Sequence, residues 1–417
     1  MLNLLTDNRA LSSGSFWHLF CLSSLYFAQG LPVGFLFLAL NTYFASKGAS
    51  ISELAIFNSF LLIPWTIKIF LAPFVDGFTI QKFGRRRFWI ISSQIIMILV
   101  LLPLIFIEVT AVSTLLIAIF TVHNLFVATC DIATDALAAD SLRESDLAKA
   151  NGYMWGSKII GRGLGMLISS SLLFTYGFNV SILFLICCMT LVFVFPFVSS
   201  ELDHKEGAED RKQYGNVLGI KFLLSEISQG LLNKTAIAAV VFMLFSNIAV
   251  GIFDVTYNKF YLEVIGMTGE DIGSIRPIGM WLGGLIGFAV GLVSFYLGKR
   301  LLLVGFVASQ LILFILLSTF TVETSYQIGS LTIIGLDITE AGMKVVIFAI
   351  LMALCTTQTS ATNFGIFMGF SNLSVVIGNS IAPLLVESLS YDFTYIFAGL
   401  SLIPCIVLAF YLTKAKN

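Results

Sequence analysis

Long apolar stretches recur along this chain, and each has about 20 residues, the length an α-helix needs to cross a membrane. The strands of a membrane barrel would instead alternate in polarity over about 10 residues. Of the 417 residues, 58% are hydrophobic and 11% are charged, whereas soluble domains carry about 25% charged residues. The sequence therefore predicts an all-α integral membrane protein.

The apolar stretches predict twelve spans, and a long polar interruption follows the sixth of them. Two six-helix halves joined by a charged linker are expected of secondary transporters with repeated halves. We therefore predict an N-terminal bundle over 1–200, a cytoplasmic linker over 201–234 and a C-terminal bundle over 235–417. The spans are 17–43, 53–76, 87–107, 112–140, 147–175, 179–200, 235–262, 269–297, 300–321, 343–361, 363–388 and 392–413.

The placement of Lys and Arg predicts the orientation of the spans. If the N-terminus is cytoplasmic, only Lys47, Lys259 and Lys344 fall at the outer ends of spans. The other basic residues outside the spans then lie on the cytoplasmic side. Cytoplasmic loops carry the excess of positive charge in membrane proteins, so we expect both termini in the cytoplasm.

Charged residues also lie inside the predicted spans, most densely between 123 and 165. Asp131 and Asp135 are four residues apart in span four, and Lys158 and Arg162 are four apart in span five. This spacing places each pair on one helical face. A charge at such a depth is unfavourable unless it is paired or hydrated, so we expect the functional site here.

Lys68, Asp131 and Lys158 fall at a similar depth when each helical residue adds a rise of about 1.5 Å. An ion-paired cluster of these residues is therefore expected, and it can either contact the substrate or serve only to fix helix packing. Arg162 lies nearer the midplane, where secondary transporters usually hold their substrate. Its guanidinium can bind a carboxylate or phosphate through two parallel hydrogen bonds.

Polar uncharged residues of span one add a plausible lining to this region. Tyr26 and Gln29 can hydrogen-bond sugar or amide groups, although bonding to a neighbouring helix explains them equally well. The residues predicted to bind substrate are Arg162, Lys158, Lys68, Gln29, Tyr26 and Arg276.

Buried acids are the candidates for proton coupling. Burial and a nearby cation act in opposite directions on the proton affinity of a carboxylate, so proton occupancy can change when the cation moves. Asp254 and Arg276 lie in the outer parts of spans seven and eight and are expected to pair. The candidates are Asp131, Asp135 and Asp254, and the sequence leaves the choice among them open.

The turn after span two contains an acid, a glycine and a basic run, Asp76 to Arg87. Such a turn can clamp neighbouring helices through charge pairs and helix termini. We predict that Asp76, Arg85, Arg86 and Asp140 form a gate at the cytoplasmic face. The turn resembles the loop between helices two and three of the major facilitator superfamily. Its longer spacing resembles the branch of AmpG-type muropeptide permeases and acetyl-CoA transporters.

Other motifs carry the same resemblance over nearly the whole chain. The chain departs from the pattern at Met154, where the muropeptide permeases usually place a basic residue. The matching segments are Phe27–Pro32, Lys68 with Ala72, Pro73 and Asp76, Asp131 with Asp135 and Asp140, Gly152 with Tyr153 and Gly156, and, more loosely, Asp254 with Gly266, Gly273 and Arg276.

The resemblance implies a proton-coupled importer of an anionic amphiphilic solute, such as an anhydromuropeptide, in the inner membrane. Uptake of a carboxylate siderophore and transport of acetyl-CoA stay open as alternatives. An enzyme is not expected, because His18, His123 and His204 are too far apart for a metal motif. We expect a monomer in the lipid bilayer, without metal, cofactor or nucleic acid; no basic block indicates nucleic-acid binding.

Overall fold

The structure is a computed structural model, and within the residues it describes every element is a helix. A described helix overlaps each of the twelve predicted spans, and the all-α architecture is confirmed. In this part of the chain, 9 helices are long and apolar enough to cross a membrane. The described residues are 16–68, 70–71, 75, 84–141, 144–198, 234–354 and 360–414.

The described residues divide into two compact units. Unit 1 comprises those of 1–39 and 67–222, and unit 2 those of 40–66 and 223–417. The predicted domains, 1–200 and 235–417, stay a prediction, and 201–233 of the predicted linker lie outside the described residues.

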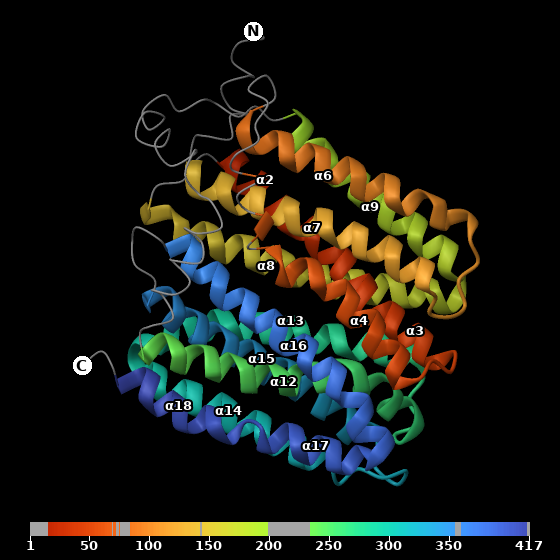
Figure 1. The fold of residues 1–417 in the computed structure, drawn as a ribbon, viewed down its shortest axis with the longest axis vertical. Helices are drawn as coiled ribbons and strands as arrows, with labels where there is room; N and C mark the ends of the chain where they lie inside the picture. Colours follow the sequence, from red (N-terminus) through yellow and green to blue (C-terminus); the bar gives the residue numbers. More distant parts are fainter. Residues whose placement is uncertain are drawn as a thin grey trace. The chain divides into compact units, whose positions relative to one another are not determined.

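Unit 1 contains long helices that lie beside one another along their lengths (Figure 1). Its elements are α2 (Phe16–Gly34), the π-helix η1 (Phe35–Ala39), α6 (Arg85–Leu101), the 3-10 helix η3 (Leu102–Phe106), α7 (Thr114–Ser141), α8 (Glu144–Thr175) and α9 (Phe178–Val198).

Unit 2 is built around α12, which packs against α16 and α18 (Figure 1). Its elements are α3 (Leu40–Ser46), α4 (Ile51–Thr66), α12 (Lys234–Glu263), α13 (Gly269–Leu297), α14 (Lys299–Leu317), α15 (Tyr326–Leu354), α16 (Ser360–Ser388), α17 (Tyr391–Leu400) and α18 (Ile403–Lys414).

Glycines bring α2 and α8 into backbone contact. A Cβ added to Gly30 would lie 2.3 Å from the Lys158 carbonyl oxygen, and one on Gly34 would lie 2.1 Å from that of Arg162. From the other helix, a Cβ on Gly161 would lie 2.4 Å from the Phe27 carbonyl oxygen. Small residues four apart permit this approach in membrane helices. We call this contact the glycine seam; it fixes Lys158 and Arg162 beside α2.

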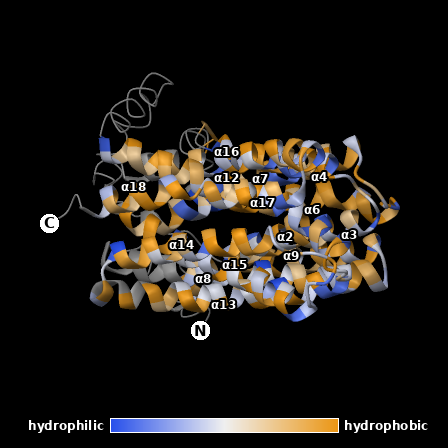
Figure 2. Cartoon of the chain, turned by 90° about the horizontal axis from the view of Figure 1, so that it is seen from below, coloured by the Kyte–Doolittle hydropathy of each residue, from blue (hydrophilic) through white to orange (hydrophobic). Residues whose placement is uncertain are grey.

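Hydrophobic residues predominate along the helices, as Figure 2 shows. Large apolar side chains stay exposed, among them Phe106, Leu285 and Phe288. In a membrane such side chains face acyl chains, while the backbone polar groups are satisfied within each helix.

The tenth helix begins earlier than the sequence predicted. The expected span was 343–361, whereas α15 begins at Tyr326. The segment before 343 contains glycines and two acids, which lower its hydropathy and made it resemble a loop. Packing decides the outcome, because Gly279 and Gly283 of α13 contact this segment closely.

Candidate functional site

Two ammonium groups flank one buried carboxylate in unit 1. Lys68 Nζ lies 2.6 Å from Asp131 Oδ2, and Lys158 Nζ lies 3.3 Å from Asp131 Oδ1. The Asp131 side chain is only 5% exposed. Asp131 lies on α7, Lys158 on α8 and Lys68 two residues after the end of α4, and the predicted ion pairs among them are confirmed as a geometry. We call Lys68, Asp131 and Lys158 the Asp131 cluster.

Asp135 lies one turn further along α7 and has a different environment. It accepts a hydrogen bond from the Tyr26 hydroxyl, and its Oδ2 lies 3.9 Å from Lys68 Nζ. Its side chain is 47% exposed. A carboxylate on a membrane helix is strongly disfavoured in lipid and therefore faces water or a partner. The arrangement indicates that water reaches this side of α7.

Tyr26 and Gln29 of α2 contact the Asp131 cluster from one side. Lys158 Nζ donates to Gln29 Oε1 at 3.3 Å and lies 5.2 Å from the centre of the Tyr26 ring. It also lies 5.3 Å from the centre of the Trp155 ring, so two aromatic faces stabilise the ammonium group. Both α2 side chains are buried, and their part in substrate binding stays a prediction.

Arg162 of α8 makes no ion pair within the described part of the chain. Its Nε is buried and has no hydrogen-bond partner there. A guanidinium keeps its charge under all physiological conditions. The described ionisable residues of this region are three cations and two acids, and Arg162 is the cation that pairs with neither acid. That charge can bind an anionic group. The set is Lys68, Lys158 and Arg162 against Asp131 and Asp135.

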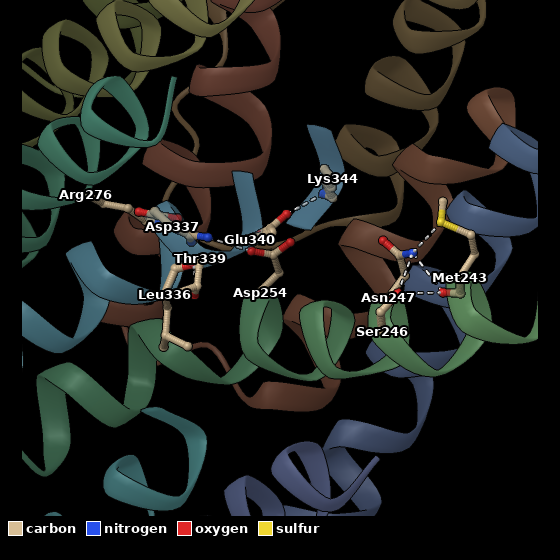
Figure 3. Close-up of polar contacts among 10 residues, drawn as sticks. All are labelled: Met243, Ser246, Asn247, Asp254, Arg276, Leu336, Asp337, Thr339, Glu340 and Lys344. Carbon is tan, nitrogen blue, oxygen red and sulfur yellow. Dashed lines mark hydrogen bonds and ion pairs between the residues drawn. The ribbon is translucent and has the colours of Figure 1, made fainter. Parts of the chain in front are cut away.

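Unit 2 holds a second cluster, in which one arginine lies between two acids (Figure 3). Arg276 Nη2 donates to Asp254 Oδ1 at 2.7 Å, and Arg276 Nε lies 3.5 Å from Asp337 Oδ1. The guanidinium carbon is 4.0 Å from the centre of the Tyr257 ring. The expected pairing of Asp254 with Arg276 is confirmed. We call Asp254, Arg276 and Asp337 the Arg276 cluster.

The cluster encloses Arg276 almost completely, since the side chain is only 1% exposed. Ion pairing, aromatic contact and burial all hold it in place. Its predicted role in substrate binding therefore stays a prediction. The geometry favours a role in ion pairing with Asp254 and Asp337.

Asp337 was missed by sequence reasoning. The predicted tenth span began at 343, so Asp337 and Glu340 were assigned to an outer loop. The structure places both in α15, where Lys344 donates to Glu340 (Figure 3). Lys344 therefore lies inside a helix and is not an outer-end residue. The available signal was the four-residue spacing of Glu340 and Lys344, which is typical of a helical ion pair.

Most side chains of the predicted gate lie outside the described part of the structure. Asp76 lies outside the described residues, and for Arg85 and Asp140 only the backbone is described. Arg86 is buried. The next residue, Arg87, donates from Nε to the Pro196 carbonyl oxygen at 2.9 Å. A cation at the last carbonyls of α9 agrees with the expected clamp at a helix terminus.

The described residues contain no group of three His, Cys, Asp or Glu side chains that could hold a metal ion.

Two interior charge clusters on an all-helical membrane fold are features of a secondary transporter. The sequence model of the Major Facilitator Superfamily matches residues 21–339, and the chain belongs to this superfamily. Like its relatives, it is a transporter and not an enzyme.

Relatives extend over nearly the whole chain. It is 23% identical to a Rickettsia felis protein that carries the name transporter AmpG 4, over 96% of this chain and 98% of that protein. It is also 23% identical to the anhydromuropeptide permease of Escherichia coli K12, over 92% of this chain and 77% of the permease. Within the superfamily, these relatives support the predicted resemblance to AmpG-type permeases.

Solved structures support the same fold. The inward-open xylose transporter XylE from E. coli superposes with a TM-score of 0.69 at 14% identity. The superposition covers 96% of this chain and 96% of XylE. The chain is a multi-pass protein of the inner membrane that carries a small molecule.

Proposed function

We propose that this chain imports an anhydromuropeptide together with protons across the inner membrane. The observation that carries the proposal is Arg162, a half-buried cation on α8 whose buried Nε has no hydrogen-bond partner and which makes no ion pair in the described residues. An anhydromuropeptide is a disaccharide with a short peptide and therefore bears carboxylates. The name of the E. coli relative supports this solute.

Arg162 is proposed to bind a carboxylate of the solute. The guanidinium presents parallel N–H groups that match the two oxygens of a carboxylate. The glycine seam holds the Arg162 backbone against Gly34, so the side chain extends from a fixed base. Fixed donors bind a ligand with less loss of conformational entropy than mobile ones.

The other polar residues around the Asp131 cluster are proposed to have supporting roles. Lys158 and Lys68 are proposed to bind substrate, with Tyr26 and Gln29 as hydrogen-bonding neighbours. Asp131 and Asp135 are proposed to exchange protons when these lysines move. Asp135 is the more suitable of the two for exchange with water because its side chain is the more exposed.

The orientation is proposed to place both termini in the cytoplasm. The basic residues Lys47 and Lys259 then lie at outer helix ends, and Lys344 no longer counts because it lies within α15. Without Lys344, fewer basic residues lie on the outer side, which agrees better with the positive-inside rule. A monomer is proposed, as is typical of transporters of this superfamily.

A carboxylate siderophore is the second candidate. The positive charge at Arg162 fits any carboxylate, and the geometry favours neither solute by charge alone. Acetyl-CoA carries phosphates and is an alternative for the same reason.

The test is uptake by right-side-out membrane vesicles supplied with labelled N-acetylglucosamine–anhydro-N-acetylmuramyl tripeptide, ferric citrate or acetyl-CoA. We expect uptake of the muropeptide, its loss in Arg162→Ala and partial retention in Arg162→Lys, which keeps the charge but loses the paired N–H groups. Arg300→Ala, at the exposed start of α14, is the matched control. Normal uptake by Arg162→Ala would contradict the role of Arg162, and uptake of ferric citrate alone would favour the second candidate.

A further inference from the structure

An aromatic ring lies beside the charges that are proposed to bind the solute. We infer that the Trp155 indole on α8 is a stacking surface for a pyranose ring, so that the sugar of the solute lies on Trp155 while its carboxylate lies on Arg162. Assigning this sugar to an anhydromuropeptide rests on the proposed function, whereas the existence of a sugar-binding surface does not.

Trp155, Lys158 and Arg162 occupy one face of α8. They are spaced by three and then four residues, which places them in a single stripe along an α-helix. Trp155 is two turns from Arg162, which is roughly 10 Å along the helix axis. The indole and the guanidinium are thus separate points on one helical face, and an extended solute can reach both at once.

Contacts with two neighbours hold the Trp155 ring in place. Lys158 Nζ lies 5.3 Å from its centre, and the Tyr26 ring meets it edge-on with 6.4 Å between the ring centres. Tyr26 in turn donates a hydrogen bond to Asp135. These contacts fix the orientation of the indole, and a ring that is already fixed loses little conformational entropy when it binds a ligand.

Part of the indole stays open to a ligand, because Trp155 is 38% exposed despite these contacts. Tryptophan is common at membrane interfaces, where its ring lies among lipid headgroups. Trp155 differs, because its ring contacts the charged Lys158 and the tyrosine bonded to Asp135. Charged groups of membrane helices face the protein interior or a water-filled cavity, and the indole beside them faces the same way.

A partly exposed indole beside a hydrogen-bond donor suits the chemistry of a pyranose. The C–H groups on one face of the sugar pack on an aromatic ring, while the hydroxyl and acetamido groups at its rim need hydrogen-bond partners. Gln29 supplies a donor here: its Oε1 accepts from Lys158, and its buried Nε2 has no hydrogen-bond partner in the described residues. A buried donor without a partner is unfavourable, and a sugar oxygen would satisfy it.

Tryptophan fluorescence of the purified protein tests the sugar surface with N,N′-diacetylchitobiose, a neutral disaccharide of N-acetylglucosamine that has no carboxylate. We expect a saturable change in the emission of the wild type that is lost in Trp155→Phe. The same substitution on α13 of unit 2, Trp281→Phe, is the matched control and should keep the change. The absence of a change in the wild type, an equal change in Trp155→Phe, or a response to adenosine in place of the disaccharide would overturn the inference.

Competition against labelled muropeptide, bound to the purified protein in lipid, separates stacking from packing. In Trp155→Leu, the inhibition constant of diacetylchitobiose should rise about tenfold, the order expected for a lost aromatic contact. The inhibition constant of the free tripeptide should stay unchanged, because its carboxylates bind Arg162. Trp155→Phe keeps an aromatic face and should lie between the wild type and Trp155→Leu.

Tyr176→Leu is the matched control for this competition, since it removes a ring that is 69% exposed directly after α8. Both inhibition constants should stay at their wild-type values in this variant. Equal weakening of both competitors in Trp155→Leu would show that Trp155 only supports packing, and would overturn the inference. If the wild type binds diacetylchitobiose through Trp155 but takes up no muropeptide, the proposed function fails while the sugar surface stands by itself.

Discussion

The backbone carbonyl of Arg162 faces Gly34 so closely that a Cβ on Gly34 would lie 2.1 Å from its oxygen. The residue proposed to bind the solute is thus fixed by the backbone of another helix. This relationship joins packing to function, because the position of the guanidinium depends on an atom that Gly34 does not have.

Gly34→Ala should therefore disrupt both stability and uptake. The added methyl group overlaps backbone that cannot rotate away, and overpacking of this kind costs about 1–3 kcal/mol. Thermal unfolding in detergent and vesicle uptake measure the two effects. Gly156→Ala on α8 is the matched control, since its Cβ would meet nothing within 4 Å. Equal behaviour of the two variants would contradict the importance of the glycine seam.

Loss of Asp131 should be more harmful alone than in combination with loss of a lysine. Asp131→Asn leaves Lys68 and Lys158 without their shared carboxylate, and breaking a buried pair costs about 3–5 kcal/mol. In Asp131→Asn with Lys68→Met, one of the two uncompensated charges is removed. A double-mutant cycle on thermal stability measures the coupling. Additive losses would show that the two residues act independently.

Gly279→Ala should lower the stability of the packing between α13 and α15. The new Cβ would lie 2.8 Å from Asp337 Oδ2 and 3.0 Å from the Ile334 Cα. Asp337 must then move relative to Arg276, and the ion pair of 3.5 Å changes. Gly305→Ala on α14, where nothing lies within 4 Å, is the matched substitution. Thermal unfolding in detergent compares them, and an unchanged unfolding temperature of Gly279→Ala is the adverse result.

Uptake should fall as the external pH rises, because a proton enters with each transport cycle. For the same reason a protonophore should abolish accumulation while leaving exchange intact. Vesicles with an imposed pH gradient measure both. Accumulation that survives the protonophore and responds to Na⁺ would replace the proton by another coupling ion.

The fold and half of the site were predictable from the sequence. Spans of apolar residues indicated helices, and the four-residue spacing of Asp131 with Asp135 placed both on one face of α7. The cation partners followed from depth along the helix, because membrane helices rise uniformly. Lys68 and Lys158 therefore met Asp131 as expected.

The rest required packing information. Asp337 lies in a segment whose apolar run is interrupted by glycines and two acids, and this segment packs closely against α13. The glycines of α8 were visible as a group, but the sequence did not show that Gly161 contacts α2 while Gly156 contacts nothing. Tertiary contacts decide both cases, and they leave no periodic signal in a single helix.

The glycine seam constrains which solutes fit beside α2 and α8. Because α2 and α8 meet backbone to backbone, the main-chain positions of Gln29 and Tyr26 are fixed relative to those of Lys158 and Arg162. A solute whose polar groups are spaced differently has to change its own conformation, since the protein at this place has little freedom to adapt. Discrimination by length would then be built into the main chain, and side-chain exchanges would alter affinity without altering that spacing.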